Sequence, residues 1–232
     1  RQRQMCIRDR FDACIVHGEY QKEKLGQLKA DTKIMIGGYP KHYYYKIPDQ
    51  DEIKNELGIN TEKKILVYFP TWDEDCGIIK FGNQIAKLKN QYFIIIKLHH
   101  VLSRDFSNPA RKMAYEIADM VLGGNYDFEK ATALADFILS DAKSGATLES
   151  LYLNQQTPAA FLSVRENINE WYYPEISMAA PVISNPDRLN EVIENYKLSD
   201  FIESRKNVIL RCYGKSNYPY FKDNVSDLLQ VI

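Results

Sequence analysis

Short apolar runs alternate with amphipathic stretches along most of the chain, and each run is closed by glycine, proline or polar residues. The runs predict strands at 13–16, 33–36, 65–69, 92–98, 120–122, 137–139, 159–162 and 182–184. The stretches between and after them predict helices at 19–30, 51–57, 81–90, 109–119, 128–134, 145–153, 187–196, 200–211 and 217–231. Strands that alternate with helices of this length are typical of βαβ units. The sequence therefore predicts an α/β fold, a Rossmann-like doubly wound parallel sheet.

Two segments depart from this pattern. Residues 1–10 (RQRQMCIRDR) carry four arginines and no apolar period, which indicates a tail that is disordered or not native to the fold. Gly37, Gly38 and Pro40 predict a sharp turn. We therefore divide the chain into the tail 1–10, a segment 11–40 that ends with this turn, and a main lobe 41–232.

Polar residues follow three of the predicted strands. The sequence PTWDED with Thr71 follows 65–69, His99 and His100 follow 92–98, and SDAKSGATLE follows 137–139. The carboxyl ends of parallel strands meet at one sheet edge, where such folds bind their ligands. The sequence therefore predicts one site built from these three loops.

The third loop has the composition of a phosphate-binding turn. Ser144, Gly145, Ala146 and Thr147 are small or hydroxylated and lie where a helix is predicted to begin. Amides at a helix N-terminus bind phosphate, and Glu149 one turn later can accept hydrogen bonds from ribose hydroxyls. The alternative is ordinary helix punctuation, in which a serine caps the helix and an acid occupies its first turn.

The other polar residues have a chemical and a structural interpretation. His99 can donate to a diphosphate or shuttle a proton, or it can be a half-buried imidazole, and His100 points the opposite way if the strand continues. The acidic residues of PTWDED can hold a divalent cation, but acids in loops are more often solvated. We expect no metal site and no cofactor, a packing role for Trp72 and a solvated Lys143.

Charge and cysteine content narrow the class of protein. Thirty Lys+Arg against 31 Asp+Glu leave a formal net charge of -1, so no basic field points to nucleic acid. The four cysteines are scattered without a CxxC pair, which indicates reduced thiols in a cytoplasmic protein. An apolar run long enough to span a membrane is absent from the sequence.

In their order, these passages resemble the CDP-glycerol glycerophosphotransferases of teichoic acid biosynthesis, which have the GT-B fold. KKILVYFPTWDED is similar to that family's ILYAPTWRDD, without the arginine. FIIIKLHH resembles its KxHP passage, with His99 on the histidine and His100 in place of the proline. ADFILSDAKSGATLESLYLNQQTPAAFL resembles ADILITDYSSVMFDFALLKKPIIFY, with Asp141 on the aspartate and Ser144 on the second serine.

The same third passage also resembles the DSGGIQEEA loop of UDP-N-acetylglucosamine 2-epimerases, another GT-B family. Ala142 and Lys143 replace the Tyr-Ser of the first family, and Gly145 and Ala146 follow the epimerase pattern. The resemblance covers roughly residues 11–230. It implies the C-terminal, donor-binding lobe of a GT-B enzyme, preceded by the end of the N-terminal lobe.

The resemblance implies an inverting transfer in which an acceptor hydroxyl attacks the phosphorus nearer glycerol and CMP leaves. It implies that His99, Thr71 and residues 144–147 stabilise the charge of the donor diphosphate, and that Asp141 and Glu149 contact the ribose or nucleotide. The partners implied are a CDP-glycerol or UDP-sugar donor and a polyol-phosphate or glycan acceptor, with no nucleic acid. The family's catalytic base lies in the N-terminal lobe, which this chain mostly lacks.

Two alternatives to this transferase remain open. The chain can be related to the epimerases or to a nucleotide-sugar glycosyltransferase, or it can be a non-catalytic nucleotide-binding module that keeps the fold without the chemistry. The location implied by the resemblance is cytoplasmic, with peripheral association at the inner face of the cell membrane left open.

Overall fold

The computed structural model describes residues 13–27, 33–42, 45–166, 173–214, 222–223 and 226. The tail 1–10 and nearly all of the last predicted helix, 217–231, lie outside these ranges. The chain divides into two compact units, one of Arg1–Tyr45 with Asn207–Ile232 and one of Lys46–Lys206. These units differ from the segments predicted from the sequence, in which residues 41–232 form one lobe. The predicted boundaries at residues 10 and 40 stay a prediction.

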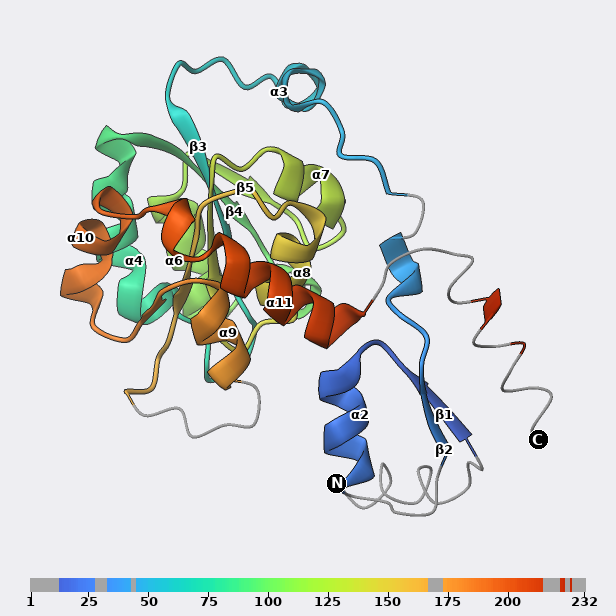
Figure 1. The fold of residues 1–232 in the computed structure, drawn as a ribbon. Helices are drawn as coiled ribbons and strands as arrows, with labels where there is room; N and C mark the ends of the chain where they lie inside the picture. Colours follow the sequence, from blue (N-terminus) through green and yellow to red (C-terminus); the bar gives the residue numbers. More distant parts are fainter. Residues whose placement is uncertain are drawn as a thin grey trace. The chain divides into compact units, whose positions relative to one another are not determined.

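The larger unit is built on one parallel sheet (Figure 1). Its strands are β3 (Lys64–Phe69), β4 (Tyr92–Lys97), β5 (Met120–Leu122), β6 (Phe137–Asp141), β7 (Ala159–Leu162) and β8 (Val182–Ile183). They lie in the order β5-β4-β3-β6-β7-β8, with every pair parallel. The direction of winding therefore reverses between β3 and β6, as in a Rossmann-like doubly wound sheet. The predicted α/β class and parallel sheet are confirmed.

Helices precede, link and follow the strands of the sheet. They are α3 (Gln50–Leu57), α4 (Ile78–Lys87), α5 (His100–Arg104), α6 (Pro109–Ile117), α7 (Phe128–Ala133), α8 (Ala146–Leu153), α9 (Tyr173–Ala179), α10 (Leu189–Glu194) and α11 (Ile202–Tyr213). The sequence pattern does not predict α5 and α9. The last helix, α11, begins in the larger unit and continues into residues of the smaller one.

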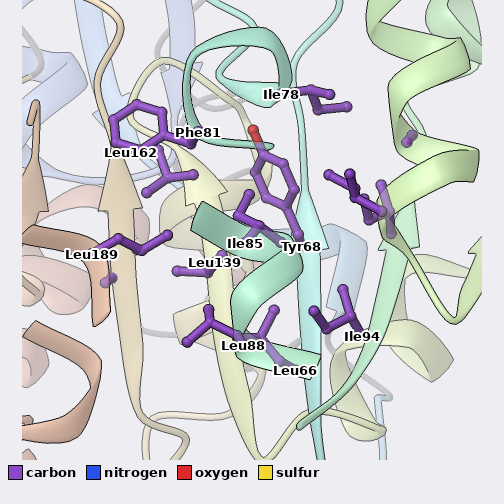
Figure 2. Close-up of a cluster of buried hydrophobic side chains, with 14 of the residues drawn as sticks. Leu66, Tyr68, Ile78, Phe81, Ile85, Leu88, Ile94, Leu139, Leu162 and Leu189 are labelled. Atoms are coloured by element: carbon purple, nitrogen blue, oxygen red, sulfur yellow. The ribbon is translucent and has the colours of Figure 1, made fainter. Parts of the chain in front are cut away.

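The hydrophobic core explains why the strands read as continuous apolar runs. Alternate residues of each strand point to opposite faces, and both faces are covered. On one face, Leu66 and Tyr68 of β3 pack with Phe81 and Ile85 of α4, all nearly inaccessible to solvent (Figure 2). On the other face, the ring of Phe69 lies 5.0 Å from that of Phe128 at the start of α7.

Two of the strand ends that differ from the prediction affect the candidate site. β6 continues to Asp141, two residues beyond the predicted end, because Ser140 and Asp141 still pair with β7. β4 ends at Lys97 and helix α5 begins at His100. The strand therefore does not continue through His99 and His100, and the condition under which they would point to opposite sides is not met.

The smaller unit holds β1 (Ala13–Val16), α2 (Glu19–Gly26) and β2 (Lys33–Ile36), with β1 and β2 paired in parallel. These are the predicted strands, while α2 ends before the predicted helix does. Within the same unit, the ring of Tyr39 lies 4.7 Å from that of His17 and 4.8 Å from that of Tyr213.

Candidate functional site

A pocket of about 230 Å³ opens beside the point where the winding of the sheet reverses. It is lined by Phe69, Pro70, Lys97, Leu98, His99, Phe128, Ser144, Gly145, Ala146 and Glu149. These residues come from the carboxyl ends of β3, β4 and β6 and from the start of α7 and α8. The structure thus brings together His99, residues 144–146 and Glu149, as the sequence predicts.

The turn before α8 combines an exposed glycine with a hydrogen-bonded serine. Gly145 is exposed, and a Cβ added to it would meet nothing within 4 Å. The Oγ of Ser144 accepts a hydrogen bond from the Ala146 amide at 3.2 Å, and the Ser144 carbonyl accepts one from the Thr147 amide at 3.1 Å. Gly145 and not Ser144 occupies the N-cap position of α8, so the serine stabilises the turn that precedes the cap. Phosphate binding at this turn stays a prediction. The open space over Gly145 would let a phosphate approach the backbone.

The Thr147 hydroxyl does not line the pocket. The side chain is buried, and its Oγ1 donates to the Asp141 carbonyl at 2.7 Å and lies 3.1 Å from the Ser140 hydroxyl. Its predicted contact with phosphate would require breaking a buried hydrogen bond, which is costly. The structure therefore gives Thr147 a role in fixing the turn.

Asp141 is also turned away from the pocket. It has the same strand parity as Leu139, which places its side chain on the face covered by α4. Its carboxylate is buried and accepts from the Tyr68 hydroxyl at 2.6 Å and from the Thr71 amide at 2.7 Å. The predicted contacts of Asp141 with a nucleotide and of Thr71 with a phosphate therefore find no support in this geometry.

Burial raises the pKa of the Asp141 carboxyl from 3.8 to about 7, although hydrogen bonds from Tyr68, Thr71 and the Gly77 backbone lower it. The native protein then holds this proton between about pH 4 and pH 7, where the unfolded chain has lost it. The contribution of the Asp141 carboxyl to the free energy of unfolding is therefore fully present below about pH 4. It declines as the pH rises to about 7.

We expect Asp141→Asn to remove this pH dependence, because an amide does not titrate. Between pH 4.5 and 7, the free energy of unfolding of the wild type relative to the variant should fall by up to about 1.4 kcal/mol per pH unit. Urea unfolding at several pH values measures this difference. A constant difference would show that Asp141 is ionised throughout that range.

Lys97 is a pocket residue that sequence reasoning misses. It occupies the last position of β4, on the face opposite Ile96, and its Nζ donates to the Gly124 carbonyl at 3.2 Å. Strand parity is the signal that could have revealed it, because a lysine at the carboxyl end of an otherwise apolar strand must lead out of the core. It brings a positive charge to the pocket.

His99 combines capping of a helix with a place on the pocket wall. Its Nδ1 accepts a hydrogen bond from the Val101 amide at 3.3 Å, so in the neutral ring the proton lies on Nε2. Burial, together with the charges of His100 and Lys97, lowers the pKa of the His99 imidazole from its usual 6.5. At neutral pH the ring is therefore an uncharged donor, and not the imidazolium that the sequence interpretation allows.

Trp72 is not the packing residue that the sequence predicts. Its side chain is 48% exposed, and its ring is stacked at 6.1 Å on that of His99 with an interplanar angle of 24°. His100 approaches the other histidine instead of pointing away, with ring centroids 4.1 Å apart. The loop after β3 and the end of β4 therefore meet through these aromatic rings.

The acidic loop residue Asp75 is paired with cations. Its carboxylate lies 2.8 Å from the Lys143 Nζ and 3.0 Å from the Arg165 Nε, and Arg165 also contacts Glu74 at 2.8 Å. The expectation of a solvated Lys143 is therefore wrong. Across the described ranges, no group of three or more His, Cys, Asp or Glu side chains is arranged to hold a metal ion. Within the same described ranges, no helix combines the length and the apolar character needed to cross a lipid bilayer.

The fold and the pocket define a Rossmann-like lobe of the GT-B class. Residues 7–144, more than half of the chain, match the family model described as CDP-glycerol:poly(glycerophosphate) glycerophosphotransferase. The chain therefore belongs to this family.

The curated relatives agree with this assignment, and the solved structures agree with its fold. The chain is 27% identical over 219 residues to the teichoic acid poly(glycerol phosphate) polymerase of Bacillus spizizenii, covering 84% of this chain and 54% of that protein. A structure of the wall teichoic acid polymerase TagF with CDPG has a TM-score of 0.61 at 19% identity, with 96% of this chain and 57% of that chain covered. The chain thus spans about half the length of these relatives.

The second resemblance is supported at the level of the fold. The UDP-GlcNAc 2-epimerase of Neisseria meningitidis, solved with UDP-GlcNAc, has a TM-score of 0.55 at 18% identity. The match covers 94% of this chain and 61% of the epimerase chain. At this identity the likeness concerns the architecture alone.

Proposed function

We propose that the chain is the donor-binding lobe of a CDP-glycerol-dependent glycerophosphotransferase. The observation that supports this most directly is the pocket in which Lys97, His99 and the turn at residues 144–146 meet. A cation, a neutral N–H donor and an open glycine turn at a helix start are suited to a diphosphate.

The size of the pocket fits part of a nucleotide donor. Its volume of about 230 Å³ is below the roughly 300–1,000 Å³ of complete ligand pockets. The diphosphate would lie over Gly145 beside Lys97, and Glu149 would accept hydrogen bonds from the ribose hydroxyls. Phe69 and Phe128 form an apolar wall beside these polar groups.

In the proposed reaction, an acceptor hydroxyl attacks the phosphorus nearer glycerol and gives its proton to the base of the N-terminal lobe. The bond from that phosphorus to the bridging oxygen breaks, and CMP leaves. Negative charge on the leaving phosphate increases during this step. Lys97 and the Nε2–H of His99 would stabilise that charge from fixed positions. The acceptor, a polyol phosphate or glycan, and peripheral membrane association are further expectations of the family.

Calorimetric titration of the 232-residue chain with CDP-glycerol, UDP-GlcNAc and CMP tests the proposal. We expect CDP-glycerol to bind and Lys97→Met to weaken it about tenfold or more, because a charge-assisted hydrogen bond contributes about 1.5–3 kcal/mol. Ser144→Ala should weaken binding by a smaller factor, about 2–10-fold.

Lys64→Met is the matched control, because Lys64 is an exposed lysine at the opposite, amino end of β3. It removes the same charge and should leave the affinity unchanged. If none of the three ligands binds at millimolar concentration, the proposal is wrong. Preferential binding of UDP-GlcNAc would replace it with a UDP-sugar enzyme.

A further inference from the structure

Two loops that border the pocket are joined through a single residue. The backbone carbonyl of Asp141 accepts from the Ser144 amide at 2.8 Å and from the Thr147 hydroxyl at 2.7 Å. Its carboxylate accepts from the Thr71 amide at 2.7 Å and from the Tyr68 hydroxyl at 2.6 Å. Asp141 therefore holds the turn before α8 with its main chain and the loop after β3 with its side chain.

The loop at residues 70–77 meets the Asp141 carboxylate near both of its ends. The Thr71 amide donates a hydrogen bond to the carboxylate at the start, and Gly77 packs closely against it at the end. A Cβ on Gly77 would lie 2.5 Å from the Asp141 Oδ1, so this close approach requires glycine. Between these two points the loop carries Trp72, whose ring is stacked on His99.

We propose that Asp141 is a positioning residue, which fixes loop 70–77 and thereby sets Trp72 against His99 without contacting a ligand. Its buried location and its two strong acceptor contacts place the constraint beneath the pocket wall. The groups that face the carboxylate are Tyr68, Cys76 and Asp73. The positioning role of Asp141 rests on the proposed function in one respect only, the expected effect of Asp141 on the affinity for the donor.

Trp72 itself reports on this arrangement. A protonated imidazole quenches the emission of a stacked indole much more than a neutral one does, so the emission should follow the titration of His99. The charged groups that face His99 are Lys97, His100 and Asp73, and the last of these lies on the same loop as the indole. Displacement of the loop would change both the amplitude and the midpoint of the titration.

The experiment is a pH titration of tryptophan emission in a Trp171→Phe background, which leaves Trp72 as the sole tryptophan of the chain. We expect Asp141→Ala to abolish most of the pH-dependent change, because the loop loses its acceptor. Asp141→Asn should restore it, since the amide oxygen can accept from Thr71 and the amide NH₂ can donate to Tyr68.

Leu189→Ala controls for a general loss of stability. Leu189 is fully buried in α10, the helix that follows β8. In the sheet, β8 is the edge strand at the end opposite β4 and β5. Truncation of Leu189 costs about 2–5 kcal/mol, the usual range for a buried leucine. This variant should keep the wild-type titration. An unchanged titration in Asp141→Ala, or an equal change in Leu189→Ala, contradicts the proposal.

Hydrogen exchange on the wild-type chain keeps the proposal testable even if Asp141→Ala does not fold. The Thr71 amide should exchange as slowly as the amides of β3, because its acceptor is buried. Exchange at the rate of an exposed loop would overturn the positioning role.

Donor affinity separates this proposal from the previous one. If the wild type binds CDP-glycerol, Asp141→Ala should weaken that binding about tenfold or more, since small displacements of polar contacts are costly, and Asp141→Asn should bind nearly as well as the wild type. If the wild type binds no donor while the emission and exchange results hold, the proposed function fails and the positioning role of Asp141 stands.

Discussion

Replacing Arg205 with methionine is expected to lower the free energy of unfolding of the larger unit by about 3 kcal/mol. The guanidinium is fully buried and donates to the carbonyl oxygens of Gln155, Thr157 and Ala179 at 2.7–3.0 Å and to the Tyr196 hydroxyl at 2.7 Å. Methionine keeps much of the packing of the stem but leaves these acceptors without their donor. A buried polar group left unsatisfied costs about 1–3 kcal/mol.

The matched control for this prediction is Lys206→Met. Lys206 is the next residue of α11, is exposed, and pairs with Glu203 on the same helix. Such a pair contributes less than about 1 kcal/mol, so the midpoint of urea unfolding should hardly change. Arg205→Lys should lie between the two, because an ammonium cannot reach all the acceptors of a planar guanidinium. Equal midpoints for Arg205→Met and Lys206→Met would show that the buried contacts contribute little.

Gly77→Ala is expected to lower the free energy of unfolding by about 2–3 kcal/mol, the cost of forcing extra volume into a packed interior. The added Cβ would lie 2.5 Å from the Asp141 Oδ1 and 2.9 Å from the Tyr68 hydroxyl oxygen. Neither atom can retreat without losing the hydrogen bond between them.

Gly145→Ala provides the comparison, because a Cβ at Gly145 has open space around it. This variant should melt with the wild type in a thermal unfolding experiment, whereas Gly77→Ala should melt several degrees lower. If a donor phosphate approaches the Gly145 backbone, the same variant should bind CDP-glycerol more weakly in spite of its normal stability. A loss of stability in both variants, or in neither, would contradict the packing argument.

Most of the fold could be predicted from the sequence because parallel strands covered on both faces must be apolar along their whole length. β3 and β4 are such runs, and the structure ends each of them within one residue of the predicted position. The pocket could be predicted in part for the same reason. The topology of a parallel sheet brings the ends of its strands to one edge, which is why His99 and Gly145 line a common pocket.

The errors arise where a strand is longer than predicted, because the extra residues fix the direction of side chains that were expected in a loop. The predicted end of β6 left Asp141 in a loop, where a nucleotide contact was reasonable. The two further residues of strand place its carboxylate on the opposite face, beneath α4. Ion pairs between loops cannot be predicted from local sequence patterns either, because the partners are distant in the sequence. The pair of Lys143 with Asp75 is an example.

The sequence by itself determined the class of fold and the sheet edge at which polar residues gather, because hydrophobic periodicity and strand order are local or topological properties. Only the tertiary structure decided which of those polar residues face the pocket. Lys97 faces it, whereas Asp141 and Thr147 bond inward to neighbouring segments. The physical reason is that a polar side chain near a strand end serves whichever buried partner the neighbouring loops bring to it, and that partner is distant in the sequence.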